Sequence, residues 1–217
     1  MNKKKRNFFI STILILLAVV FTILVKVVDV KQVGVNGTSI GFATVNQFVF
    51  EFIGVNMIWY HITDWLGLVP IFMAMAYALI GFIQLIKRKS IFKVDKEIII
   101  LGLFYIVVIS IYIFFEKVIV NYRPILMNGF LEASYPSSHT LMTISLCGSS
   151  IILNKKLLNN KITRVIDVLS LVIILITVIG RLISGVHWFT DIIGGIFISI
   201  ALLMTLFLII DVKKKNN

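Results

Sequence analysis

Hydrophobic residues along the chain fall into six long runs separated by polar connectors. The runs cover 8–28, 65–86, 98–115, 140–153, 166–183 and 188–210. A membrane-spanning helix needs about 17–25 mostly apolar residues, and five of the runs satisfy this requirement. The fourth run is shorter, which predicts that its outer end is polar or that it lies in a recess lined by protein. The pattern predicts an all-α membrane protein with six transmembrane helices.

Two shorter features flank the first two runs. Apolar positions recur at helical spacing over 42–53, which predicts either an interfacial helix or a packed loop. Trp59, Tyr60 and Trp65 cluster at the predicted outer boundary of the second span, as interfacial aromatic residues do. The first run is longer than the apolar core of a signal peptide and no cleavage site follows it, so we expect a retained helix. No repeat or linker divides the chain, so we expect one membrane-embedded domain over 1–217.

Composition and charge distribution agree with this pattern. Of the 217 residues, 59% are hydrophobic and 14% are charged, which excludes a disordered chain or an ordinary soluble domain. The net charge of +11 does not indicate nucleic-acid binding, because sixteen of the 21 Lys and Arg residues occupy the two ends of the chain and alternate connectors. The positive-inside rule therefore predicts a multi-pass protein of the cell membrane with both termini cytoplasmic. The connectors 29–64, 116–139 and 182–190 are expected to face outward. The single cysteine, Cys147, cannot form an internal disulfide.

Polar residues in the outward connectors form a candidate phosphate site. Arginine binds phosphate oxygens through paired hydrogen bonds and lysine adds a point charge, so Arg123, Arg181 and Lys117 together predict a phosphate cradle. His187 and Asp191 are four residues apart, which places them on one helical face. The carboxylate is expected to hold one imidazole nitrogen and leave the other free to attack.

A second histidine supplies the remaining part of a phosphoryl-transfer site. His139 follows Pro136-Ser137-Ser138, a turn into the fourth span, where amides near a helix N-terminus favour an anion. It is placed to act as a general acid for the leaving oxygen. Taken singly, these residues also suit simpler roles: Arg181 and Lys117 as membrane-interface anchors, His139 and Asp191 as capping or packing groups. Their joint spacing favours the catalytic interpretation.

Together these residues resemble the three motifs of the type 2 phosphatidic acid phosphatase family, K-x6-R-P, P-S-G-H and S-R-x5-H-x3-D. Arg123-Pro124 ends the first motif, Pro136-Ser137-Ser138-His139 corresponds to the second, and Arg181, His187 and Asp191 carry the third. The resemblance implies that His187 attacks phosphorus to form a phosphohistidine, that Asp191 supports it and that His139 protonates the leaving group. It also implies phosphate binding by Arg123 and Arg181 with a contribution from Ser137, and no metal or other cofactor.

Three positions depart from the family pattern. Five residues separate Lys117 from Arg123 where the family has six, so Glu116 occupies the place of the motif lysine. Ser138 replaces a glycine, which adds a hydroxyl that can narrow the site or donate to the phosphate. Gly180 replaces a serine and removes one possible phosphate donor. We expect activity with an altered rate or substrate preference.

The sequence therefore predicts a metal-independent phosphatase acting on a lipid phosphomonoester or diphosphate at the outer leaflet. Candidate substrates are polyprenyl diphosphate, phosphatidic acid and phosphatidylglycerol phosphate. A noncatalytic lipid-phosphate binder or transporter is the main alternative, and a zinc hydrolase that uses the histidines as ligands is another. The lipid bilayer is the expected environment, and no obligatory protein partner is inferred.

Overall fold

Long helices dominate the computed structural model, which describes residues 3–157 and 160–214. The elements are α1 (Lys3–Val27), η1 (Val35–Gly37), α2 (Ala43–Ile53), α3 (Met57–Leu66), α4 (Leu68–Arg88), η2 (Ile91–Lys93), α5 (Lys96–Lys117), α6 (Ser138–Leu157), α7 (Lys161–Ile183) and α8 (Phe189–Lys214). Apart from isolated β-bridges, the described residues pair no extended segments. The predicted all-α fold class is confirmed.

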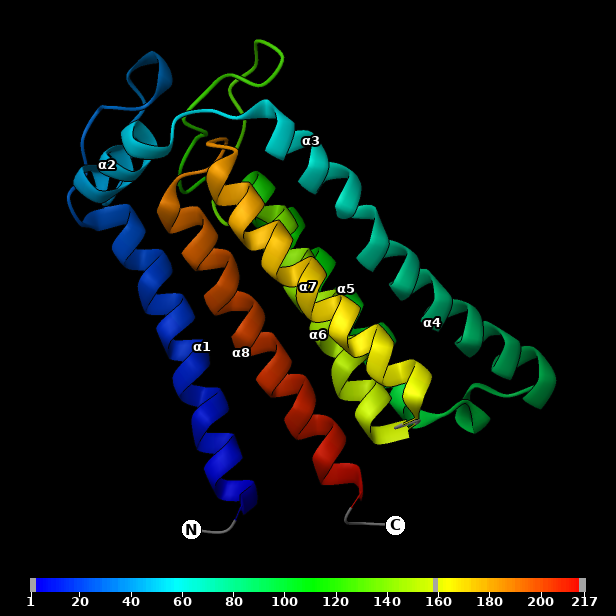
Figure 1. Ribbon diagram of the computed structural model, residues 1–217. Helices are drawn as coiled ribbons and strands as arrows, with labels where there is room; N and C mark the ends of the chain where they lie inside the picture. Colours follow the sequence, from blue (N-terminus) through cyan, green and yellow to red (C-terminus); the bar gives the residue numbers. More distant parts are fainter. Residues whose placement is uncertain (1–2, 158–159, 215–217) are drawn as a thin grey trace.

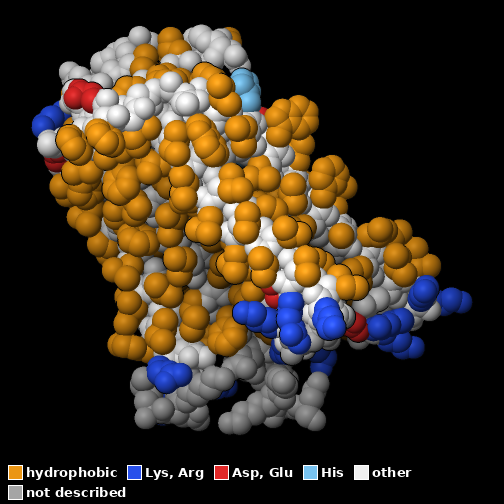
Figure 2. Space-filling view, viewed as in Figure 1, with side chains coloured by type: hydrophobic (Ala, Val, Ile, Leu, Met, Phe, Trp, Pro, Cys, Tyr) orange, Lys and Arg blue, Asp and Glu red, His pale blue; other side chains and the backbone are white. Residues whose placement is uncertain are grey.

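Five segments of the described chain are long and apolar enough to cross a membrane. They are Lys4–Val27, Met57–Arg88, Lys96–Lys117, Lys161–Ile183 and Phe189–Ile210. The long helices run alongside one another, and the first turn of α1 lies at the same end as the last turn of α8 (Figure 1). On the face in Figure 2, Lys and Arg side chains gather mainly at that end, below a broad apolar surface. These features confirm a multi-pass membrane protein.

Helix α6 differs from the other long helices because it is enclosed by protein. It packs against α4, α5, α7 and α8. Buried polar residues occur along its length: Thr140, Thr143, Ser145, Ser149, Ser150 and Asn154. Tyr77 on α4 joins this set, since its hydroxyl donates to Asn154 Oδ1 over 2.9 Å. The short fourth apolar run is thus explained by a helix whose neighbours are mostly other helices, as the recess prediction required.

Two hydrophobic clusters hold the bundle around α6. One joins Phe104 and Val108 of α5 to Leu153 of α6 and Leu206 of α8, among other residues. The other joins α1, α6 and α8 through Ala18, Leu141, Ile198 and Ala201. Both clusters include α6 and α8, which fixes these two helices relative to each other. Since the candidate site lies at the amino-terminal ends of α6 and α8, this packing positions it.

The connector between α1 and α4 contains two helices. Residues 43–53 form α2, so the helical alternative for this segment is correct and the loop alternative is wrong. Helix α3 was not predicted, because residues 57–64 lie in the connector assigned to 29–64 and only its last two residues belong to the second apolar run. Asn56 caps it, as Asn56 Oδ1 accepts from the N–H groups of Ile58 (3.1 Å) and Trp59 (3.3 Å). Helix α3 packs against α7 and leads into α4, as Figure 1 shows.

Candidate active site

Two connectors and the first turns of two helices form one polar site. The segment between α5 and α6 folds back on itself: Arg123 N–H donates to Glu132 O over 3.1 Å and Ser134 N–H to Asn121 O over 2.9 Å. Ser137 N–H donates to the backbone oxygen of Asp191 over 3.0 Å, which ties the start of α6 to the start of α8. The predicted site residues of the second and third motifs therefore come together.

His187 is buried with one nitrogen held and the other free of partners. Its Nδ1 lies 3.1 Å from both the carbonyl oxygen and the hydroxyl of Ser134. Its Nε2 is buried and has no hydrogen-bond partner among the described residues. Burial lowers the pKa of His187 well below 6.5, and the positive charges of Arg123 and Arg181 lower it further. The imidazole is thus neutral, and Nδ1–H donation to Ser134 leaves a lone pair on Nε2.

Asp191 reaches His187 through Ser134 rather than directly. Ser134 Oγ donates to Asp191 Oδ2 over 2.5 Å, and the same hydroxyl lies against His187 Nδ1. The carboxylate also accepts from Trp188 N–H at 2.9 Å and from Asn121 Nδ2 at 3.3 Å. The prediction of a direct contact between Asp191 and the imidazole is therefore wrong. The first turn of α8 directs the carboxylate back to its own N-terminal amide, and Ser134 fills the space between.

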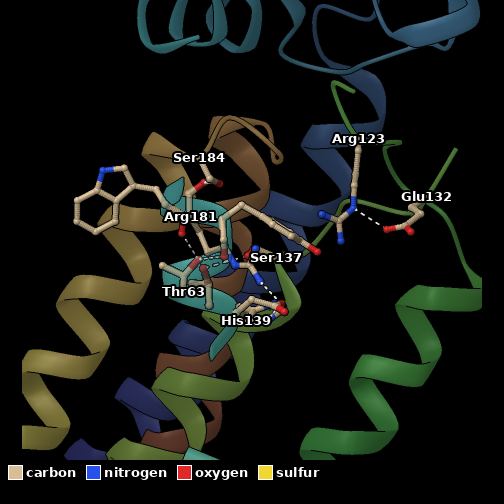
Figure 3. A network of polar contacts seen from close by, with 11 residues as sticks. Thr63, Arg123, Glu132, Ser137, His139, Arg181 and Ser184 are labelled. Atoms are coloured by element: carbon tan, nitrogen blue, oxygen red, sulfur yellow. Dashed lines mark hydrogen bonds and ion pairs between the residues drawn. The ribbon is translucent and has the colours of Figure 1, made fainter. Parts of the chain in front are cut away.

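Each of the two arginines is paired with a carboxylate from outside the three motifs. Arg123 Nε lies 3.2 Å from Glu132 Oε2, and 12% of the Arg123 side chain is exposed. Arg181 is 1% exposed, and its Nη2 donates to Asp64 Oδ1 over 3.3 Å. Its guanidinium carbon also lies 5.0 Å from the centre of the Tyr60 ring. Figure 3 shows Arg123 with Glu132, and Arg181 near the start of α6.

His139 lies at the start of α6 and shares the carboxylate of Arg181. His139 Nε2 is 3.1 Å from Asp64 Oδ1, whereas its Nδ1 is buried without a hydrogen-bond partner. Ser137, just before α6, is fully buried, and its Oγ accepts from Thr140 Oγ1 over 3.1 Å. Ser138 lines a cavity together with Arg123 and His187. The second motif thus contributes to the same region as the third.

Lys117 does not join this group. Glu116 lines the cavity, whereas the Lys117 side chain is exposed at the end of α5. Consecutive residues on a helix point about 100° apart, so only one of the two faces the site. The structure therefore gives no support to Lys117 as a phosphate ligand. Glu116, which occupies the position of the motif lysine, is the residue that lines the cavity, and its side chain is acidic.

Sequence reasoning missed four residues of the site: Ser134, Asn121, Asp64 and Glu132. Ser134 stands two residues before Pro136, and this proximity to the second motif is the sequence feature that could have indicated a place in the site. Asn121 and Asp64 carry no motif signal, because their contacts join segments 70 and 117 residues apart in the chain. Within 3–157 and 160–214, no group of three His, Cys, Asp or Glu side chains is arranged to hold a metal ion.

Comparisons with known proteins agree with this geometry. Residues 118–215 match the family model of the PAP2 superfamily, a region that begins just after Lys117 and contains the second and third motifs. The fold is similar to a crystal structure described as the first transmembrane PAP2-type phosphatidylglycerolphosphate phosphatase from Bacillus subtilis. The TM-score is 0.58, with 18% identity, over 100% of this chain and 98% of that one. A comparison with curated proteins finds no match. The predicted resemblance to the type 2 phosphatidic acid phosphatase family is confirmed over residues 118–215.

Proposed function

We propose that this chain, with its PAP2-superfamily region, is a membrane lipid phosphatase that hydrolyses a lipid phosphomonoester or diphosphate. One observation carries the proposal: nitrogen atoms of two histidines and two arginines are buried without hydrogen-bond partners. They are His187 Nε2, His139 Nδ1, Arg123 Nη1, and Arg181 Nε and Nη1. An unsatisfied buried polar group costs about 1–3 kcal/mol. A phosphate group offers oxygens for the cationic donors and a phosphorus atom for the remaining nitrogen, so it accounts for the whole set.

The geometry supports a two-step mechanism. His187 Nε2 attacks phosphorus, the bond from phosphorus to the leaving oxygen breaks, and His139 Nδ1 gives that oxygen a proton. Water then attacks the phosphohistidine, His139 accepts a proton from it, and phosphate leaves with His187 restored. Arg123 and Arg181 stabilise the charge on the phosphoryl oxygens in both steps. Ser134 and Asp191 support the positive imidazole that forms when His187 attacks. No step requires a metal ion.

A groove between α4, α5 and α6 supports entry of a lipid substrate from the bilayer. Its volume is about 280 Å³, and Leu68, Ile71 and Met142 contribute apolar walls. Asp64, Ser138 and His139 line the same groove, so its polar part coincides with the candidate site. A lipid headgroup can reach His139 while its tail remains among apolar side chains. This arrangement suits a lipid better than a soluble phosphate ester.

The membrane topology belongs to the same proposal. Helix α6 is the sixth span. Its sequence is less hydrophobic than those of the other five, because its neighbours are mostly other helices rather than lipid. The basic connectors and both ends of the chain then lie in the cytoplasm, by the positive-inside rule. The site lies at the opposite end of the bundle and faces the outer leaflet of the cell membrane.

The substrate is proposed as a class with three members: polyprenyl diphosphate, phosphatidic acid and phosphatidylglycerol phosphate. The Bacillus subtilis protein of similar fold is described as a phosphatidylglycerolphosphate phosphatase. At 18% identity this similarity shows the fold, so the three lipids must be compared directly. Purified full-length protein in detergent should release phosphate from at least one of them. The ratios of kcat/KM then identify the preferred lipid.

His187→Ala is the decisive variant, with His61→Ala as its control. His61 is exposed on α3, and its ring contacts that of Tyr60. We expect His187→Ala to lose turnover while inorganic phosphate still binds, and His61→Ala to retain activity. A wild-type protein that binds lipid phosphate without releasing phosphate would support the binder or transporter alternative. Activity that a chelator abolishes and zinc restores would support the metal-dependent alternative.

A further inference from the structure

Asp64 is an acidic residue of the site that belongs to none of the three motifs. It lies on α3, and one of its oxygens, Oδ1, is 3.1 Å from His139 Nε2 and 3.3 Å from Arg181 Nη2. Arg181 is almost fully buried, whereas 48% of the Asp64 side chain is exposed. The carboxylate therefore reaches into the site from one side and contacts two groups that approach it from α6 and α7.

Close packing of α3 against α7 brings this carboxylate into place. A Cβ atom at Gly180 would lie 2.5 Å from Thr63 Cγ2 and 3.0 Å from Trp59 Cε3, so no larger residue fits there without a shift. Gly180 is the position at which the third motif of the family has serine. Figure 3 shows Thr63 close to Arg181 and His139. The close approach of α3 to α7 thus leaves room only for glycine at position 180 and also brings Asp64, the residue after Thr63, to the site.

The junction between α3 and α4 packs against His139. A Cβ atom at Gly67 would lie 3.0 Å from His139 Cδ2 and 3.4 Å from its Nε2. The imidazole is therefore confined on this side by backbone and held at Nε2 by Asp64. Both constraints come from the same short stretch of chain, which fixes the orientation of the ring.

Asp64 leaves the other nitrogens of its two partners available. His139 keeps a buried Nδ1 without a hydrogen-bond partner, and Arg181 keeps Nε and Nη1 in the same condition. Substrate can therefore contact both residues while Asp64 remains bound to them. A carboxylate that merely occupied the phosphate position would instead have to leave before substrate could bind.

We propose that Asp64 is a positioning residue that orients His139 as the general acid and holds Arg181 in its phosphate-binding pose. This role rests on the proposed phosphatase function. Asp64 accepts Nε2–H, so the second proton of the imidazole lies on Nδ1, which is the atom that donates to the leaving oxygen. After proton transfer, neutral His139 keeps its hydrogen bond to Asp64 and presents Nδ1 as a base toward water.

The leaving group of the substrate provides the test. Phosphatidic acid releases an alkoxide that needs a proton, whereas 4-nitrophenyl phosphate releases a stable phenolate that does not. General acid catalysis contributes about 10²–10⁴-fold, so Asp64→Asn should lower kcat/KM on phosphatidic acid by about 10–100-fold. The loss on 4-nitrophenyl phosphate should be smaller, because its leaving group needs no proton and only the positioning of Arg181 is affected there. Glu51→Gln is the matched control, because Glu51 is an exposed acid on α2 that bonds Gln47.

The outcomes separate this role from the proposed function itself. Equal losses on both substrates, or full activity on phosphatidic acid, would overturn the positioning role while phosphatase activity stands. A wild-type protein inert on both substrates would overturn the proposed function and this role with it. Asp64→Glu keeps the carboxylate and should retain more activity on phosphatidic acid than Asp64→Asn. If Asp64→Asn does not accumulate in the membrane, Asp64→Glu replaces it in the comparison of the two substrates. An equal loss of activity of Asp64→Glu on both substrates would then overturn the positioning role.

Discussion

Removing the hydroxyl of Ser134 tests whether Asp191 acts on His187 through this side chain. Ser134 Oγ donates to Asp191 Oδ2 over 2.5 Å and lies 3.1 Å from His187 Nδ1, and all three residues are buried. A hydrogen bond to a charged group contributes about 1.5–3 kcal/mol. Since about 1.4 kcal/mol corresponds to a factor of ten, Ser134→Ala should lower kcat/KM by about 10–100-fold. Residual activity should remain, because the backbone carbonyl of Ser134 still accepts Nδ1–H.

A double-mutant cycle shows whether the two residues act as one unit. The assay measures phosphate release from phosphatidic acid in detergent for Ser134→Ala, Asp191→Asn and the double variant. If Asp191 acts through Ser134, the double variant should lose no more activity than Asp191→Asn alone. Independent residues would instead add within about 0.3–0.5 kcal/mol, and such additivity would refute the reasoning. Ser110→Ala is the control, because Ser110 is exposed on α5 and its hydroxyl donates to the backbone of its own helix.

Three further predictions follow from burial, packing and charge. The pKa of His187 lies well below 6.5 in the folded protein, so the unfolded chain takes up this proton first and the free energy of unfolding falls as the pH drops below 6.5. Between pH 7.5 and 5.5, the unfolding midpoint in detergent should therefore decrease less for His187→Gln than for the wild-type protein. Gly180→Ala gains about 1 kcal/mol of helix propensity but loses about 1–3 kcal/mol by overpacking against Thr63, so its unfolding midpoint should fall and be restored by adding Thr63→Ser. In calorimetry, Lys117→Ala should bind inorganic phosphate as tightly as the wild-type protein, whereas Arg181→Ala should bind it more weakly. An equal loss of affinity in both variants would contradict the placement of Lys117 outside the site.

The helices and most catalytic candidates could be predicted because their signals are local in sequence. Long apolar runs define helices by composition alone, and motif spacing brings His187 and Asp191 close together, although His187 precedes α8 and only Asp191 lies in its first turn. The charge of the connectors correctly separated the loop-rich end that carries the site from the end where Lys and Arg gather, as Figures 1 and 2 show. Each of these inferences uses residues within one element or one connector. None of them required knowledge of which helices touch.

The missed parts of the site depend on contacts between distant segments. Helix α3 is only ten residues long and lies in a connector with mixed polarity, so its apolar pattern gave no separate signal. Asp64 becomes part of the site only because α3 packs on α7, a contact that spans 117 residues of sequence. The direct contact predicted between Asp191 and His187 failed for a related reason. His187 precedes the first residue of α8, so the two residues do not share a helical face as predicted, and Ser134 from another segment lies between them.

The two arginines of the site are held by ion pairs of different character. The Arg123 side chain is 12% exposed and its partner Glu132 is 44% exposed, so the charge of Arg123 retains some access to water. A phosphate is therefore expected to replace Glu132 at a smaller cost than a partner of a fully buried arginine. Arg181 is 1% exposed, and removing a partner from a buried charge costs far more. Its contact with Asp64 is thus expected to persist when substrate binds, which is consistent with the free Nε and Nη1 of Arg181 being the atoms that meet the phosphate.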